Sequence, residues 1–425
     1  MRKGVRTVNY NLDVLNRLDK IKEDKDIKGL SYAIFPGTHC PLFGVALTAS
    51  YIKGLALLVV GTSECTYYTK VFSNYRHKGN DKVFSLVLKE NDVVFGADKK
   101  VKEAVEYIAK NNDVTGVMVV TTCVPELIGE DYEGIVDEIS EDLDIPVLVV
   151  KTEHYKCNSH IPGMTRSISA LINLMKKQEN NNGINILGHR QEGVENTELI
   201  RLLKGEGIEI NTIIPSKCEI DEIRNATKAK LNIVTDMIAL DLAEKMEKRF
   251  KVPYIFFDKH MNKEIIDECY RKIEEILEIK LQDKLAQIRD EYDYLFVEAK
   301  KLLNKKKFIY GNTPMMAFET AEFLVELGLE PELIQVRELY DVDIKWKDKI
   351  LEKGFNPYVT RIANIAPLRH LYDKLNSEIY IGHENPMLLK QKGLKQLTLD
   401  ANAQKIGYEL PIGIMKVLIE SFKED

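Results

Sequence analysis

The stretch that decides the fold is residues 40–68, CPLFGVALTASYIKGLALLVVGTSECTYY. Its centre, LALLVVG at residues 55–61, is a continuous apolar run, which is typical of a strand buried on both faces of a parallel sheet. Cys65 comes just after this run, and Cys40 opens the glycine-containing segment before it. The stretch therefore predicts a buried parallel strand with one thiol just past its end and a second thiol upstream.

A second apolar run, GVMVVTTC at residues 116–123, repeats this arrangement and ends on Cys123. The helix-like VPELIGEDYEGIVDEIS and the strand-like IPVLVVKT follow it, which gives one βαβ unit. Parallel sheets place their sites at the carboxyl ends of the strands. We therefore expect Cys65 and Cys123 to lie at the same edge of a sheet, within reach of Cys40.

The rest of the chain predicts an α/β protein of three Rossmann-like, doubly wound domains with parallel sheets. The polar segment QENNNG at residues 178–183 is the expected linker, and the βαβ pattern restarts after it and again at KKKFIYGN. We expect a cysteine-bearing domain at 1–177, a second domain with long charged helices at 178–306, and a third domain with a C-terminal helix at 307–425. A short helix is expected around residues 11–22.

Composition excludes several classes of protein. A net charge of −6 over 425 residues lacks the basic excess of nucleic-acid-binding proteins, and no apolar run is long enough to span a membrane. The first residues carry positive charge without an apolar core, unlike a signal peptide. Six cysteines in a chain of this length do not indicate a disulfide framework. We expect a cytoplasmic protein that binds neither nucleic acid nor membrane.

Three thiols near one sheet edge suit soft metals: an iron–sulfur cluster, zinc or copper(I). Zinc is the weaker hypothesis, because structural zinc sites come from short paired motifs and this chain has no CxxC pair among the three. The alternative is that Cys40, Cys65 and Cys123 pack as small apolar side chains. Our hypothesis is that all three are ligands of an iron–sulfur cluster.

Local sequence favours the cluster hypothesis through a family resemblance. Residues 40–68 resemble the cluster-binding segment of nitrogenase component-1 subunits, particularly the beta type, in a Cys-x-x-x-Gly opening, a Gly-x-x-x-Cys closing and a following aromatic pair. VVTTCVPELIGEDYEGIV (119–136) is similar to the third cysteine motif of that family. DVVFGADKK (92–100) and NSHIPG (158–163) resemble the family segments before and after it.

This resemblance implies a [4Fe–4S] or P-cluster-like centre, held by Cys40, Cys65 and Cys123 and shared between subunits. It implies low-potential electrons from an ATP-dependent iron protein, relayed to a substrate or cofactor. Three thiolates are one short of the four that usually hold such a cluster, so a partner chain or a non-cysteine ligand is expected. The partner is an identical or paralogous subunit in a dimer or tetramer. No P-loop is present, so ATP hydrolysis is assigned to the iron protein.

The sequence also departs from the family. Where the nitrogenase alpha subunit has a cysteine ligand for its iron–molybdenum cofactor, KLNIVTD places Asp236, and LTLDANAQKIGYELPIG lacks the matching histidine. Reduction of dinitrogen itself is therefore not expected, and no catalytic residue is identified. The alternative function is a non-catalytic scaffold on which a nitrogenase-type metallocofactor is assembled.

For the other candidate ligands, an ordinary structural role is an alternative to metal binding. His154, Cys157 and His160 in EHYKCNSH either border the cluster or belong to an ordinary polar loop, and His39 is a candidate neighbour of the cluster. Cys218 and Cys269 are expected to be structural.

Overall fold

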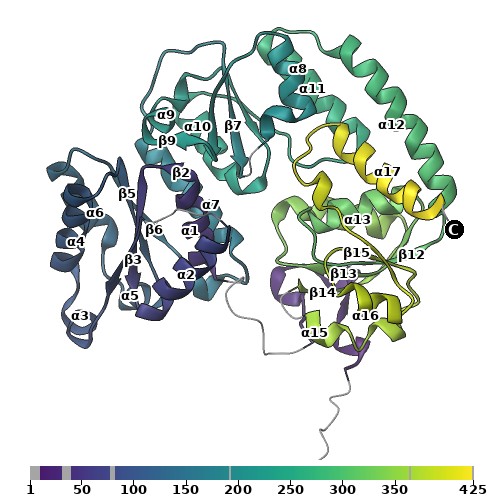
Figure 1. Ribbon diagram of the computed structural model, residues 1–425, viewed down its shortest axis with the longest axis horizontal. Helices are drawn as coiled ribbons and strands as arrows, with labels where there is room; N and C mark the ends of the chain where they lie inside the picture. The colour runs from purple at the N-terminus through teal and green to yellow at the C-terminus, as the bar shows by residue number, and fades with distance from the viewer. Residues whose placement is uncertain (1–9, 31–39, 77–81, 191–192, 363–364, 424–425) are drawn as a thin grey trace, which may run out of the picture. The chain divides into compact units, whose positions relative to one another are not determined.

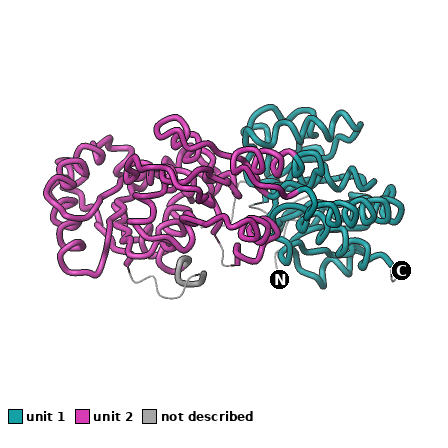
Figure 2. The backbone as a smooth tube through the Cα atoms, turned by 90° about the horizontal axis from the view of Figure 1, so that it is seen from above, with its two compact units in different colours: residues 1–35, 259–267, 282–425 teal, residues 36–258, 268–281 magenta. Residues whose placement is uncertain are grey.

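The computed structural model describes residues 10–30, 40–76, 82–190, 193–362 and 365–423. The chain forms two compact units, which are coloured separately in Figure 2. Unit 1 consists of Met1–Phe35, Lys259–Asp267 and Gln282–Asp425, and unit 2 of Pro36–Asp258 and Glu268–Leu281. The units divide the chain at other residues than the three domain ranges expected from the sequence, and that three-domain division stays a prediction.

The first sheet of unit 2 is built on the two apolar runs. Strands β3 (Leu55–Gly61) and β5 (Gly116–Thr121) lie at its centre, in the order β4-β3-β5-β6 with β4 (Val83–Val87) and β6 (Val147–Lys151). All its pairings are parallel. Every residue of β3 and β5 is buried, as expected for strands covered on both faces.

Helices cover both faces of this sheet (Figure 1). Leu57 and Val59 of β3 pack with helices α1 (Pro41–Tyr51) and α7 (Ile161–Ala170). The alternate residues Ala56, Leu58 and Val60 pack with α4 (Asp98–Asn111) and α6 (Tyr132–Asp142) on the opposite face. The apolar run thus supplies two cores at once.

Unit 2 contains a second parallel sheet, ordered β11-β10-β7-β8. Its strands are β7 (Ile184–His189), β8 (Ile210–Pro215), β10 (Leu231–Val234) and β11 (Tyr254–Phe256). Leu187 and Val234 of this sheet belong to the same buried cluster as Leu57 of the first sheet. The pair β2 (Ile52–Lys53) and β9 (Cys218–Glu219) also joins the two halves of unit 2. A continuous core therefore links the two sheets.

Unit 1 is built around a six-stranded sheet of order β1-β14-β13-β12-β15-β16. Five strands are parallel: β12 (Lys307–Tyr310), β13 (Glu330–Val336), β14 (Tyr358–Arg361), β15 (Ile379–Ile381) and β16 (Lys395–Leu397). Strand β1 (Asn16–Arg17) adds an antiparallel edge. Along the chain, β13 and β14 are added on one side of β12, and β15 and β16 are then added on its other side. This order makes the sheet doubly wound.

The expected α/β class with several parallel sheets is confirmed. The charged region expected to form long helices contains α11 (Lys263–Leu277) and α12 (Gln282–Leu303), and the chain closes with α17 (Glu409–Lys423). The other helices of five or more residues outside the cysteine region are α8 (Glu198–Gly205), α9 (Ile220–Arg224), α10 (Leu240–Phe250), α13 (Ala317–Glu326), α14 (Ile344–Glu352) and α16 (Pro386–Gln391).

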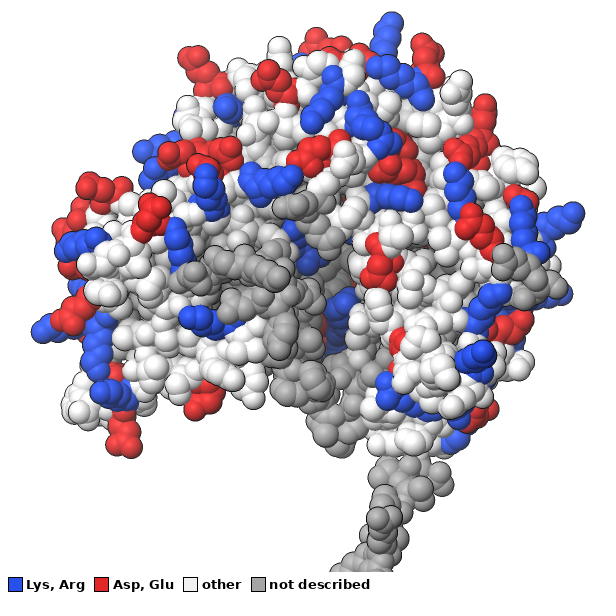
Figure 3. Space-filling view, viewed as in Figure 1, with Lys and Arg blue, Asp and Glu red and all other residues white. Residues whose placement is uncertain are grey.

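The surface carries mixed charge. Figure 3 shows Lys and Arg side chains interspersed with Asp and Glu over the face in view, unlike the basic stripe typical of nucleic-acid-binding proteins. Within the described part of the chain, no helix has both the length and the apolar character needed to cross a membrane.

Candidate metal centre

Cys65 and Cys123 follow two neighbouring strands of the first sheet. Strands β3 and β5 pair in parallel from Leu55 opposite Gly116 to Val60 opposite Thr121, so both end at one edge. Cys65 lies in the first turn of α2 (Ser63–Arg76), directly after β3, and Cys123 is the first residue of α5 (Cys123–Ile128), directly after β5. The sheet register therefore brings two thiol-bearing turns to the same edge.

Cys40 reaches this region from the start of α1, where it is the N-cap residue. Two glycines let α1 and α7 approach closely. A Cβ added at Gly44 would lie 2.0 Å from the carbonyl oxygen of His160, and one added at Gly163 would lie 1.9 Å from that of Pro41. The Pro41 contact is with the residue next to Cys40, so the packing of the two helices fixes where Cys40 sits.

The electrostatic surroundings of Cys40 and Cys123 include the other cysteines. Burial is the main cause that raises the pKa of the Cys40 thiol to about 11; the backbone N–H groups of Leu42 and Phe43 oppose the shift, and Cys123 and Cys65 make smaller contributions that raise it. The pKa of Cys123 is also raised, first by burial and then by Cys65. Such mutual effects require the thiols to lie near one another. All three are half-buried.

The residues present fit an iron–sulfur cluster better than a single ion. Among the described residues, no three His, Cys, Asp or Glu side chains gather closely enough to hold one metal ion. In a four-iron cluster each thiolate binds a different iron, so its ligands need not converge on one point. The hydroxyl of Thr122, next to Cys123, is buried without a hydrogen-bond partner among the described residues. Three soft donors suit a cluster with sulfide corners, while the Thr122 hydroxyl lies against Gly61 of β3.

The loop after β6 adds a fourth polar side chain at the same edge. His154 opens the 3-10 turn η4 (His154–Lys156), and its Nδ1 atom lies 3.2 Å from the Cys123 sulfur. The other two candidates of this segment have different contacts: Cys157 lies 3.3 Å from Arg166, and His160 packs edge-on against Phe43 of α1. His154 thus borders the thiol group, and His39 lies outside the described residues.

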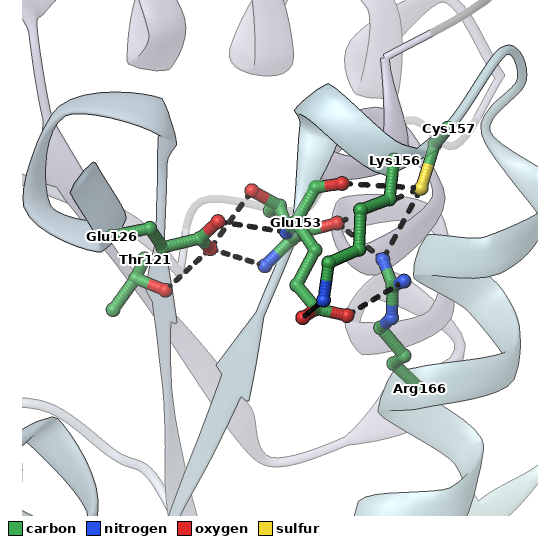
Figure 4. Close-up of polar contacts among 7 residues, drawn as sticks. Thr121, Glu126, Glu153, Lys156, Cys157 and Arg166 are labelled. Atoms are coloured by element: carbon green, nitrogen blue, oxygen red, sulfur yellow. Dashed lines mark hydrogen bonds and ion pairs between the residues drawn. The ribbon is translucent and has the colours of Figure 1, made fainter. Parts of the chain in front are cut away.

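Glu126, on α5, was not anticipated from the sequence, and it joins the ends of β5 and β6. One carboxylate oxygen accepts hydrogen bonds from the Thr121 hydroxyl at 2.7 Å and from the backbone N–H and hydroxyl of Thr152 at 2.5 and 3.0 Å. The other accepts the backbone N–H of Glu153 at 2.8 Å. Figure 4 shows this carboxylate pointing into the loop after β6. Glu126 therefore connects the turn that carries Cys123 to the turn that carries His154.

The remaining candidate residues are buried or engaged in contacts within the protein. Cys218 and Cys269 are buried, and burial raises the pKa of the Cys218 thiol. Asp236 caps the short turn after β10 by accepting the N–H of Ile238, and it forms an ion pair with Arg190 at 3.0 Å. The carboxylate that stands where the resemblance leads one to expect a cysteine is thus engaged within the protein.

Comparisons with known proteins agree on one family. Residues 40–401 match the family model described as nitrogenase component 1 type oxidoreductase. The nitrogenase iron-molybdenum cofactor biosynthesis protein NifE of Clostridium pasteurianum is 28% identical over 369 residues, which cover 83% of this chain and 79% of that protein. The nitrogenase vanadium-iron protein beta chain of Trichormus variabilis is 23% identical over 378 residues, or 76% of this chain and 81% of that one.

A third relative is matched over a shorter range. The nitrogenase molybdenum-iron protein alpha chain of C. pasteurianum is 27% identical over 285 residues, 61% of this chain and 52% of its own length, so the alignment spans about half of that protein. Among solved structures, one titled "Nitrogenase Cp1 at pH 6.5" superposes with a TM-score of 0.76 at 17% identity, covering 93% of this chain and 94% of that one. This structural likeness shows a shared fold.

Proposed function

Because the chain belongs to the nitrogenase component 1 type oxidoreductases, we propose that Cys40, Cys65 and Cys123 bind an iron–sulfur cluster through which the protein relays low-potential electrons to a substrate or cofactor. The observation that carries the proposal is that Cys65 and Cys123 stand on turns after adjacent parallel strands that end at one sheet edge, and that Cys40, half-buried like them, begins α1, which packs against the same sheet. When bound, the cluster supplies one-electron redox chemistry, and the chain's own residues position it and exclude water.

The fourth ligand position supports a shared site. Four cysteines usually hold a [4Fe–4S] cluster, and we assign three thiols of this chain to it, because the fourth half-buried thiol of this region, Cys157, lies 3.3 Å from the Arg166 guanidinium. We propose that a second subunit, identical or paralogous, completes the site in a dimer or tetramer. A subunit interface at this edge would also cover the half-buried cysteines.

An exposed apolar patch at the same edge supports docking of an electron donor, which we propose to be an ATP-dependent iron protein. Val94 and Phe95 on α3 (Glu90–Phe95) are 71% and 83% exposed, and Leu127 on α5 is 75% exposed. The two segments are tied together because the carboxylate of Glu130 accepts the N–H of Ala97. Exposed apolar side chains on neighbouring segments are typical of protein–protein contact sites.

Assembly of a metallocofactor is the second candidate function. It is supported by relatives that are named as iron-molybdenum cofactor biosynthesis proteins. A scaffold would use the same thiols to hold a cluster before passing it on, so both functions need the same site.

The test begins with anaerobic purification and measurement of iron, sulfide and the EPR spectrum of the reduced protein. We expect a cluster signal in the wild type and its loss when Cys40, Cys65 and Cys123 are all replaced by serine. A wild-type protein without iron and sulfide would overturn the proposal. Turnover with iron protein and ATP supports the reductase, whereas transfer of a preformed cluster to an apo-enzyme supports the scaffold.

A further inference from the structure

The position of His154 is set by an unusual backbone turn at the end of β6. Glu153 adopts a left-handed conformation, with φ of 44° and ψ of 46°, which is unfavourable for a residue with a side chain. Its backbone N–H and that of Thr152 are both held by Glu126. The turn therefore persists because the carboxylate compensates for it, and the turn directs His154 toward Cys123.

A second clamp acts on the same turn from α7. The Arg166 guanidinium donates to the carbonyl oxygen of Thr152 and forms an ion pair with the Glu153 carboxylate at 2.9 Å (Figure 4). Lys156 also pairs with that carboxylate at 2.5 Å. The loop is thus fixed from α5 on one side and α7 on the other. A loop this well constrained suits a role in which the residue it carries needs a precise position.

When Cys123 is a metal ligand, the donor and the acceptor in its contact with His154 are fixed. A metal-bound thiolate has lost its proton and can only accept hydrogen bonds. At 3.2 Å, the His154 Nδ1 atom must then carry the hydrogen and donate it to the sulfur. One-electron reduction adds negative charge that the thiolate ligands share, so a donor at the sulfur stabilises the reduced state more than the oxidised state.

We propose that His154 is a positioning residue that raises the reduction potential of the cluster by donating a hydrogen bond from Nδ1 to the Cys123 sulfur. This inference rests on the cluster site proposed above. It assigns to the loop after β6 a task distinct from metal ligation: it tunes how readily the site accepts an electron.

The test compares His154→Leu, which removes the donor, with His154→Asn, whose amide nitrogen sits close to the place of Nδ1. Each variant is purified anaerobically, its iron and sulfide are counted, and its midpoint potential is measured by EPR-monitored titration with dithionite. We expect His154→Leu to keep its iron but to be about tenfold harder to reduce at a fixed potential, a shift of about 59 mV toward negative values for one electron. His154→Asn is expected to recover most of that shift.

Tyr155→Leu is the matched control, because Tyr155 is the exposed neighbour in the same turn. We expect its potential to equal that of the wild type. An unchanged potential in His154→Leu with full iron content overturns the inference but leaves the cluster intact. A wild type without iron overturns the proposed function instead, so the two failures are distinguishable.

Pulsed EPR on wild-type protein labelled with ¹⁵N-histidine provides a measurement that does not depend on any variant folding. A hydrogen-bonded histidine is expected to give a weak nitrogen coupling together with an exchangeable proton. A strong coupling, as from nitrogen bound directly to iron, would contradict the inference, and so would the absence of any coupling.

Discussion

At the scale of single residues, Glu126 does more for the site than its sequence position suggests. Its carboxylate accepts two backbone N–H groups and two hydroxyls from three residues of neighbouring strand ends. Hydrogen bonds to an ionised acceptor are stronger than neutral ones. Removing the charge leaves the buried donors of Thr121 and Thr152 with a weaker partner.

We therefore predict that Glu126→Gln lowers the free energy of unfolding by about 1 to 3 kcal/mol. The glutamine amide keeps one acceptor oxygen but turns an N–H₂ group toward donors that need an acceptor. Urea unfolding followed by circular dichroism measures the change. Thr121→Val, which removes only one of the four hydrogen bonds, is the control with a smaller expected loss. If both variants lost the same free energy of unfolding, the carboxylate would contribute no more than its single hydrogen bond to Thr121.

These side-chain links explain what the sequence could and could not predict about the site. Cys65 and Cys123 were predictable because each follows an apolar run, and parallel strands bring such positions to one edge. His154 was one of three candidate neighbours of the cluster in its segment, but neither which of the three contacts Cys123 nor the role of Glu126 was predictable, because both involve the left-handed turn at Glu153. Nothing in the residue types around Glu153 marks that turn, since glycine is the usual signal for it.

At the scale of elements, the chain start differs from the expected short helix. A short helix was expected around residues 11–22, but the structure has two 3-10 turns, η1 (Leu12–Val14) and η2 (Leu18–Lys20), with β1 between them. Leu15, Leu18 and Ile21 recur every three residues and are buried. Leu15 and Ile21 are the extended residues that end η1 and η2, so short turns bury these side chains without a continuous helix. Pairing of β1 with β14 then holds the segment extended.

The turn before α14 carries a carboxyl group whose protonation affects unit 1. Asp343 is almost fully buried, accepts the backbone N–H of Tyr340 at 3.0 Å, and has one oxygen without a hydrogen bond among the described residues. Burial, with a smaller effect from the charge of Glu319, raises the pKa of Asp343 from 3.8 to about 7. Because the folded pKa lies above the unfolded one, its stabilising effect is complete below about pH 4 and is lost as pH rises through 7.

We predict that unit 1 loses stability between pH 5 and pH 8, and that Asp343→Asn reduces this loss. Asparagine mimics the protonated acid, keeps the acceptor for Tyr340 and cannot ionise. Each pKa unit corresponds to about 1.4 kcal/mol, so the full effect is on the order of a few kcal/mol. Urea unfolding at the two pH values, monitored in both proteins, checks it. The same pH dependence in wild type and Asp343→Asn would refute the assignment.

At the scale of the whole molecule, the family resemblance read from the cysteine motifs is confirmed by the match over residues 40–401. Relatives of alpha, beta and biosynthesis types are all matched, so family membership does not decide between reductase and scaffold. The parallel sheets were predictable from continuous apolar runs, because both faces of such strands are buried. The division into two compact units was not, because it depends on which helices pack together across long sequence distances.

The proposed sharing of the cluster makes a prediction about assembly. If a second subunit supplies the fourth ligand, each cluster adds metal–sulfur bonds across the interface and stabilises the oligomer by linkage. Stripping iron with a chelator under anaerobic conditions is then expected to lower the native mass to that of one subunit, or to make the oligomer dissociate at a higher protein concentration. Native mass spectrometry before and after chelation measures this.

Replacing Cys123 alone with serine separates metal loss from damage by the chelator. Serine keeps the size of the side chain at the start of α5 but is a poor ligand for iron, so the fold is expected to persist while the cluster is lost or weakened. The same shift in mass should follow. If the stripped protein and Cys123→Ser both keep the wild-type mass and dissociation concentration, the cluster does not bridge subunits. The fourth ligand would then have to come from the same chain. The exposed apolar side chains of α3 and α5 would in that case be a docking site for the electron donor and not part of a subunit interface.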